Sequence, residues 1–297
     1  MKRLIDLHIH SNLSDGDLSP KEIIDRAVSN GVSTIAIADH DTICAYGDEL
    51  FDYAKEKNIQ IIKAVEISTK YHGKGIHVLG YNFGINNKEL TDRLYTIRNA
   101  RHIYLHDVAS KLDNYGYTVN VEKLDKIDAV SKSHIATDVI ENISNHDLLL
   151  KDFSHIPSKG EFIETIMNEG CPCYVEKETI TPTLASKLIK DANGKVILAH
   201  PVAYKYEDGL TDDEILNLVK EMNADGIEAN YIYIDKDNNK INEVEHWNNF
   251  AKNNNLITTI GSDFHNNDNI HPDIGLVNED IKLNDNEIDT IIDNILN

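Results

Sequence analysis

Near its N-terminus the chain reads Leu4-Ile5-Asp6-Leu7-His8-Ile9-His10, and this stretch predicts the first strand of an α/β fold. It is a short apolar run that ends in two histidines. Because His8 and His10 are two residues apart on a strand, both imidazoles should point to one face. The segment Ser19-Pro20-Lys21-Glu22 then opens a helix, with an N-cap serine, a proline at the first position and a capping-box glutamate.

Strand and helix alternate through most of the chain. Helices are expected from Pro20 to the cap at Gly31 and at 46–57, 183–191, 211–222, 243–254 and 286–296. Strands are expected at 4–9, 34–38, 60–65, 76–81, 195–199, 226–229 and 256–260. Seven strands, most of them followed by helices, favour parallel strands closed as a (β/α) barrel. The active site of such a barrel lies at the C-terminal ends of its strands.

The strand–helix rhythm breaks between about residues 86 and 169, where the chain looks mainly helical. The strongest helical stretches are 88–115, 130–142 and 161–168. We therefore expect a discontinuous barrel, 1–85 with 172–297, and an inserted helical subdomain at 86–171.

Nine residues with metal-binding side chains fall at or just after predicted strand ends: His8, His10, Asp15, His40, Glu66, His77, His200, Asp263 and His265. Imidazole and carboxylate suit zinc, manganese or iron, and nine ligands exceed what one ion needs. Two or three divalent ions are expected, and such clusters activate water and clamp phosphate.

Each motif also has a plainer interpretation. Two histidines on a strand are often only hydrogen-bonded, and His40 stands in a possible helix cap. Spacing alone does not choose between Asp15 and Asp17, which flank the turn at Gly16. Acceptors for the imidazole N–H groups are expected among three aspartates: Asp6, Asp39 and Asp41.

The motifs together resemble the PHP (polymerase and histidinol phosphatase) family, whose motifs follow in the same order. The segments that carry the resemblance are Asp6–Ser11 with Ser14–Gly16, Ala38–Thr42, Val65–Ser68, His77–Gly80, Ala199–Pro201 and Gly261–His265. The helical insertion resembles one branch, the bacterial phosphoesterases that act on nucleoside monophosphates, nucleoside 3′,5′-bisphosphates and short RNA 5′ ends.

The resemblance implies a distorted seven-stranded barrel, TIM-like, with a trinuclear site. By position it assigns His8, His10, Glu66 and Asp263 to one ion, Glu66, His77 and His200 to a second, and Asp15, His40 and His265 to a third.

Within the insertion, Val130–Ala136 resembles the Gly-Arg-Pro-His-Ile-Ala segment of that branch. Lys132 stands where arginine is expected, and lysine cannot grip phosphate bidentately. His134 is retained, and the resemblance makes Lys132 and His134 catalytic candidates. His134 would contact phosphate or donate a proton, unless it only caps a helix. Arg98 and Arg101 are further phosphate candidates, although a solvated helix face suits either one.

The leading hypothesis is hydrolysis of a phosphomonoester of a small nucleotide by a metal-activated hydroxide. The substrate would be a nucleoside 3′,5′-bisphosphate, a monophosphate or a short RNA 5′ end. Alternatives are a histidinol-phosphate phosphatase, a barrel that hydrolyses C–N bonds, and a non-catalytic PHP scaffold. The complete ligand set disfavours the scaffold.

Composition limits the possible partners. Asp and Glu outnumber Lys and Arg, 50 to 29, for a net charge of −21, which argues against a protein that grips long nucleic acid. The sequence has only three cysteines and shows no apolar run of signal-peptide or membrane-spanning length. We therefore expect a cytoplasmic protein without a membrane partner. The sequence does not indicate the oligomeric state.

Overall fold

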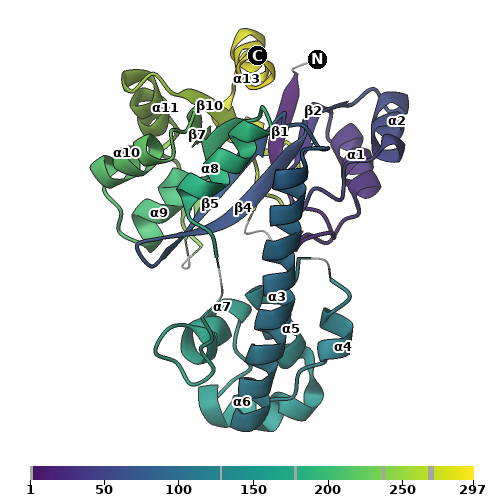
Figure 1. Ribbon diagram of the computed structural model, residues 1–297, viewed down its shortest axis with the longest axis vertical. Helices are drawn as coiled ribbons and strands as arrows, with labels where there is room; N and C mark the ends of the chain where they lie inside the picture. Colours follow the sequence, from purple (N-terminus) through teal and green to yellow (C-terminus); the bar gives the residue numbers. More distant parts are fainter. Residues whose placement is uncertain (1–2, 128, 177–178, 236–237, 267–270) are drawn as a thin grey trace. The chain divides into compact units, whose positions relative to one another are not determined.

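The chain divides into two compact units (Figure 1). Unit 1 comprises Met1–Asp92 and Thr179–Asn297, and unit 2 comprises Arg93–Glu178. The computed structural model describes residues 3–127, 129–176, 179–235, 238–266 and 271–297. Unit 2 starts later than the residue 86 expected for the insertion, because the chain just before the long helix α3 (Lys88–Tyr115) is tied to unit 1. There the Asn87 side chain donates to the Asp191 carbonyl at 3.0 Å.

The strands of unit 1 form two main sheets and a small hairpin. One sheet has the order β1 (Leu4–Ile9), β2 (Val32–Ile37), β3 (Gln60–Ile61). The other has the order β10 (Ile257–Ile260), β7 (Gly226–Asn230), β6 (Lys195–Leu198), β5 (Lys74–Tyr81), β4 (Ala64–Tyr71). The hairpin pairs β8 (Tyr233–Ile234) with β9 (Lys240–Ile241).

The expectation of a closed, all-parallel, seven-stranded barrel is not confirmed. Ten strands occur in the described part of the chain, and none of their sheets closes. Isolated bridges from Ile9 to Phe264 and from His40 to Glu66 link the two sheets. Strand β5 is antiparallel to both neighbours, β4 and β6. The reason is the two-residue turn at His72 and Gly73, which is too short for the crossover that parallel strands need.

Helices cover the outer faces of these sheets. Unit 1 contains α1 (Pro20–Ser29), α2 (Asp48–Glu56), α8 (Pro182–Asp191), α9 (Pro201–Glu207), α10 (Asp212–Glu221), α11 (Val244–Asn253), α12 (Val277–Ile281) and α13 (Asp285–Leu296). The predicted capping box of Ser19 and Glu22 is present at α1. Figure 1 shows α1 and α2 beside β2, α8 beside β5, and α13 near the start of β1. Buried residues of the strands and of α13, such as Ile5, Ile197 and Ile292, form the central core.

Unit 2 is helical, as the sequence predicts for this stretch, and has its own core. Besides most of α3 it contains α4 (Val121–Leu124), α5 (Lys132–Glu141), the 3₁₀-helix η1 (Ile143–Asn145), α6 (His146–Phe153), α7 (Lys159–Phe162) and the π-helix η2 (Ile163–Met167). Leu105, Leu112, Val139 and Phe162 pack together with no exposed surface. Within the described residues, no helix of either unit combines the length and apolarity that crossing a bilayer requires.

Candidate metal centre

The nine candidate ligands all lie in unit 1, where the ends of the parallel strands meet. His10 directly follows β1, His200 follows β6, and Asp263 comes three residues after β10. Main-chain hydrogen bonds join these strand ends: His10 N donates to Phe264 O at 2.9 Å, and Asp263 N donates to His8 O at 2.8 Å. Because β5 runs the other way, His77 reaches the same edge from near the start of its strand.

Glu66 is the carboxylate at which most of the imidazoles meet. Its side chain is 1% exposed. Five imidazole nitrogens lie 3.0–3.4 Å from its oxygens, from His8, His10 and His40 at Oε2 and from His77 and His200 at Oε1. One carboxylate that offers each oxygen to a different group of imidazoles has the geometry of a ligand shared between two ions.

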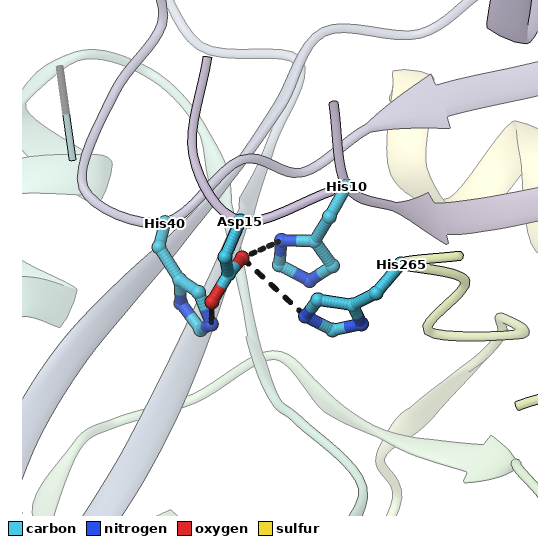
Figure 2. A group of neighbouring side chains, drawn as sticks. All are labelled: His10, Asp15, His40 and His265. Atoms are coloured by element: carbon cyan, nitrogen blue, oxygen red, sulfur yellow. Dashed lines mark ion pairs between the residues drawn. The ribbon is translucent and has the colours of Figure 1, made fainter. Parts of the chain in front are cut away.

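Asp15 forms a second focus, shown in Figure 2. Its carboxylate lies 3.6 Å from His10 Nδ1, 3.7 Å from His40 Nε2 and 3.4 Å from His265 Nε2. The loop that carries Asp15 folds tightly against β1, since a Cβ on Gly16 would lie 2.2 Å from the His10 carbonyl oxygen. This loop therefore brings Asp15, rather than Asp17, to the cluster.

Asp263 faces the two histidines of β1. Its Oδ1 lies 3.4 Å from His8 Nε2 and 3.1 Å from His10 Nε2. The two Nε2 atoms are themselves 3.1 Å apart. Both imidazole nitrogens lie close to the carboxylates of Asp263 and Glu66. The four groups therefore converge on one point, where a bound cation could accept all of them as ligands.

The electrostatics of this region are those of tightly packed opposite charges. Burial would raise the pKa of Glu66, but the nearby imidazoles, led by His77 and His40, hold it well below its usual range. Burial would lower the pKa of His10, yet hydrogen bonds to Asp263 and Glu66 raise it to about 10. For His40 burial dominates and lowers the pKa to about 3.

This donor set fits divalent metal ions. It consists of buried imidazoles and carboxylates, which zinc, manganese and iron accept as ligands. A buried ring nitrogen, Nδ1 of His200, also lacks a hydrogen-bond partner. Polar atoms buried in this way need a partner, and a metal ion would supply one.

The structure groups the ligands somewhat differently from the expected three sets. One group of side chains with ligand atoms within 4.8 Å of one another consists of His8, His10, Glu66 and Asp263. A second such group consists of His10, Asp15, His40 and His265. In the third group His40, rather than His200, joins Glu66 and His77. His200 still approaches Glu66 Oε1 at 3.2 Å.

The sequence interpretation missed His271, Glu228 and Tyr231. His271 offers a ligand atom beside Asp263 and His265. Glu228 lies 3.0 Å from His8 Nδ1, and its Oε2 accepts from His200 N at 2.9 Å. Tyr231 donates to Asp263 Oδ2 at 3.3 Å. Glu228 could have been found, because a carboxylate within the apolar strand β7 is the same signal as Glu66 on β4.

The expectation that Asp6 and Asp39 accept from imidazoles is wrong. Asp6 instead accepts from main-chain N–H groups, including those of Ser262 and Gly275. Asp39 accepts from Ser11 N and from the hydroxyls of Ser11 and Ser14. Asp41 Oδ1 accepts from Ser68 N at 2.8 Å. These carboxylates therefore hold the loops of the site in place.

The two candidates of the insertion, Lys132 and His134, lie in unit 2 at the start of α5. Ser131 N donates to His134 Nδ1 at 3.0 Å, so His134 takes part in a capping box. Lys132 Nζ donates to Asn168 Oδ1 at 3.0 Å. The solvated face expected for Arg101 is wrong, because Arg101 is 3% exposed and donates to the Val130 carbonyl.

Comparison with known proteins places the chain in a family. The family described as PHP domain matches residues 6–197. A 5′-3′ exoribonuclease of Haemophilus influenzae is 30% identical over 268 residues, which cover 89% of this chain and 91% of that protein. A 3′,5′-nucleoside bisphosphate phosphatase of Chromobacterium violaceum is 26% identical over 266 residues, 88% of this chain and 87% of that protein.

Two solved structures share the fold. An amidohydrolase of Chromobacterium violaceum, with bound sulfate, superposes with a TM-score of 0.74 at 24% identity and covers 91% of this chain and 89% of its own. A protein of Bifidobacterium adolescentis assigned to the metal-dependent phosphoesterases gives 0.76 at 18% identity, with 100% and 97% covered. The chain therefore belongs to the PHP family. It is a metal-dependent hydrolase that acts on phosphoester bonds.

Proposed function

We propose that the protein hydrolyses a phosphomonoester of a small nucleotide, a nucleoside 3′,5′-bisphosphate, a nucleoside monophosphate or a short RNA 5′ end. The observation that carries the proposal is the convergence of five imidazoles on the buried Glu66, flanked by Asp15 and Asp263. The activities named for the relatives from Haemophilus and Chromobacterium support the choice of a nucleotide.

Two or three divalent ions, manganese, zinc or iron, would be held by the nine ligands. When bound, such ions supply an activated water and positive charge for the phosphoryl oxygens. The other residues keep the ligands in position: Glu228 orients the His8 ring, and Asp39 holds the loop that carries Asp15. Tyr231 orients the Asp263 carboxylate.

Unit 2 would bind the substrate through Lys132 and His134. Both stand in the first turn of α5, where the helix dipole favours an anion. We expect Lys132→Ala to raise the KM for a nucleotide about tenfold and to leave the metal content unchanged, because one charge-assisted contact is lost. Lys126→Ala, which breaks only an exposed pair with Glu122, is the matched control. Equal KM values for the two variants would remove Lys132 from the substrate site.

A panel of phosphate esters tests the proposed function. The manganese-loaded protein would be assayed with a nucleoside 3′,5′-bisphosphate, the matching 5′-monophosphate, a 5′-phosphorylated oligoribonucleotide and histidinol phosphate. We expect kcat/KM for at least one nucleotide to exceed that for histidinol phosphate by about 100-fold or more, a range that substrate-binding contacts supply. Preferential turnover of histidinol phosphate would replace the proposal with that alternative.

A further inference from the structure

A cavity of about 530 Å³ opens beside the candidate metal centre and lies within unit 1. This volume is within the range of small-molecule sites. One side is formed by candidate ligands, among them Glu66, His77 and Asp263. Other residues of the lining, named the tyrosine wall, are Tyr231, Tyr233, Glu207 and Asp208. The wall comes from the end of α9 and from the segment after β7.

Hydrogen bonds hold the tyrosine wall in shape. Tyr233 donates to Glu207 Oε1 at 2.8 Å, and Tyr231 donates to Asp263 Oδ2 at 3.3 Å. The Tyr233 ring also stacks on Tyr206, with ring centroids 6.1 Å apart. These contacts with Glu207 and Tyr206 orient the Tyr233 ring, which lines the cavity.

The charge of the tyrosine wall is negative. Among the described residues that line the cavity there is neither lysine nor arginine, whereas Glu207 and Asp208 both line it. The nearby Lys74 donates to the main-chain carbonyl of Asp208 and is not part of the lining. Lys205 is paired with Glu243, with both carboxylate oxygens 2.9 Å from Nζ. A second phosphate placed against this wall would meet carboxylates without a compensating cation.

We infer that the tyrosine wall is the subsite for the uncharged nucleoside part of the substrate and that Glu207 disfavours a second phosphate there. This inference rests on the proposed function. The reacting phosphate faces the candidate metal ligands, and the sugar and base lie along the Tyr233 ring, since stacking on an aromatic ring suits any base. The Glu207 carboxylate accepts a hydrogen bond from a ribose hydroxyl or an exocyclic amine and repels a phosphate.

Binding of non-hydrolysable ligands tests the inference without relying on turnover. The ligands are a nucleoside 5′-methylenephosphonate and the same compound with a 3′-phosphate, titrated by calorimetry into the manganese-loaded protein. In wild type the 3′-phosphate should weaken binding. In Glu207→Gln this penalty should fall about fivefold, the effect of one nearby charge at a solvated site. Glu221→Gln is the matched control, because Glu221 also accepts from a tyrosine, Tyr71, but does not line the cavity.

An unchanged penalty in Glu207→Gln would overturn the inference, as would an equal fall in Glu221→Gln. A second pair of variants tests the ring. Tyr233→Ala should weaken binding of the nucleoside phosphonate about tenfold and leave binding of methylphosphonate unaffected. Tyr233→Phe keeps the ring and loses only the hydrogen bond to Glu207, so it should weaken the nucleoside phosphonate much less than Tyr233→Ala does. If Tyr233→Ala weakened the binding of both ligands equally, the role of Tyr233 would instead be to support the metal centre. Failure of the proposed function would appear separately, as the absence of hydrolysis in the ester panel.

Discussion

At the scale of single residues, Glu66 organises the candidate metal centre. A carboxylate that is 1% exposed would be costly to bury alone, and here five imidazoles surround it. Backbone conformation also contributes, since His200 (φ 24°) and Asp263 (φ 54°) adopt positive φ values that non-glycine residues rarely take. Such strain persists at functional sites, where the surrounding contacts impose it.

We expect Glu66→Gln to lower kcat/KM by about 100-fold or more, because the amide keeps the volume but loses the charge and one acceptor oxygen. Metal content per chain, measured by atomic emission, should fall in parallel, while the circular dichroism spectrum should stay unchanged. Glu221→Gln serves as the control for loss of a carboxylate elsewhere in unit 1. A Glu66→Gln protein with full metal content and wild-type turnover would contradict the shared-ligand geometry.

Glu228 acts on the site through His8. Its carboxylate lies 3.0 Å from His8 Nδ1 on the side of the ring away from Glu66 and Asp263, which both lie near Nε2. We therefore expect Glu228→Gln to weaken metal binding about 10–100-fold, the usual effect of losing such a partner. Competition with a fluorescent chelator measures the affinity. Affinity equal to that of wild type would mean that the ring is oriented by its packing alone.

At the scale of elements, the β4–β5 hairpin places His77 among ligands that come from parallel strands. Its two-residue turn has positive φ at both positions, 48° at His72 and 86° at Gly73. This conformation matches the twist of the strands it joins and favours glycine. The turn reverses β5, and the reversal is what brings the first half of that strand to the edge where β1, β6 and β10 end.

Replacement of Gly73 tests the importance of this turn. We expect Gly73→Ala to lower the free energy of unfolding by about 1 kcal/mol, the cost of a left-handed conformation for a residue with a Cβ. The added Cβ would meet no atom within 4 Å, so the cost is conformational. Gly75→Ala is the control, because Gly75 has equal space and an ordinary φ. Urea denaturation measures both, and equal stabilities would refute the strained-turn argument.

At the scale of the whole molecule, the charge balance depends on bound metal. The chain carries a net charge of −21, to which the carboxylates of the candidate metal centre contribute. Divalent ions bound there would offset part of this negative charge. Ligands that bind only the folded chain stabilise it by mass action.

Removal of metal should therefore destabilise the protein as well as inactivate it. We expect dialysis against a chelator to abolish turnover and to lower Tm by several degrees, since saturation at 1,000 times Kd contributes about 4 kcal/mol. Manganese, zinc and iron(II) would then be added back separately, and Tm and turnover followed together. A chelated protein with unchanged Tm and turnover would show that the centre works without an exchangeable ion.

Much of the fold could be predicted from local sequence signals. The capping box at Ser19, the apolar runs of β1 and β6 and the helical insertion all depend on residues near one another in the chain. The direction of β5 was not predicted, because an apolar strand has the same composition in either direction. Closure of the barrel was also not predictable, since it depends on the register between strands far apart in sequence.

The residues of the site were easier to predict than their contacts. Histidines and acids at strand ends are visible in the sequence. Eight of the nine candidates fall into clusters of possible ligands, and His200 joins them through its contact with Glu66. Contacts between these residues were not visible: Glu228 can be recognised as a carboxylate in an apolar strand, but its contact with His8 cannot, and neither can those of Tyr231 and His271 beside Asp263. Asp6 and Asp39 look like imidazole partners in sequence, yet folding directs them to main-chain and hydroxyl groups.

The sequence by itself determined which side chains are available for metal chemistry and that most of them occur at or just after strand ends; Glu66 and His77 instead lie in the first halves of β4 and β5. Residue type identifies the metal donors, and the run of apolar residues before them identifies the strand. Both can be recognised within a few neighbouring residues. Only the tertiary structure decided that five imidazoles surround Glu66, that the Asp15 carboxylate lies near three imidazoles, and that Glu207 and Tyr233 line one cavity. These outcomes depend on distances between segments far apart in the chain, such as those that carry Asp15 and His265, 250 residues apart, which no local pattern encodes.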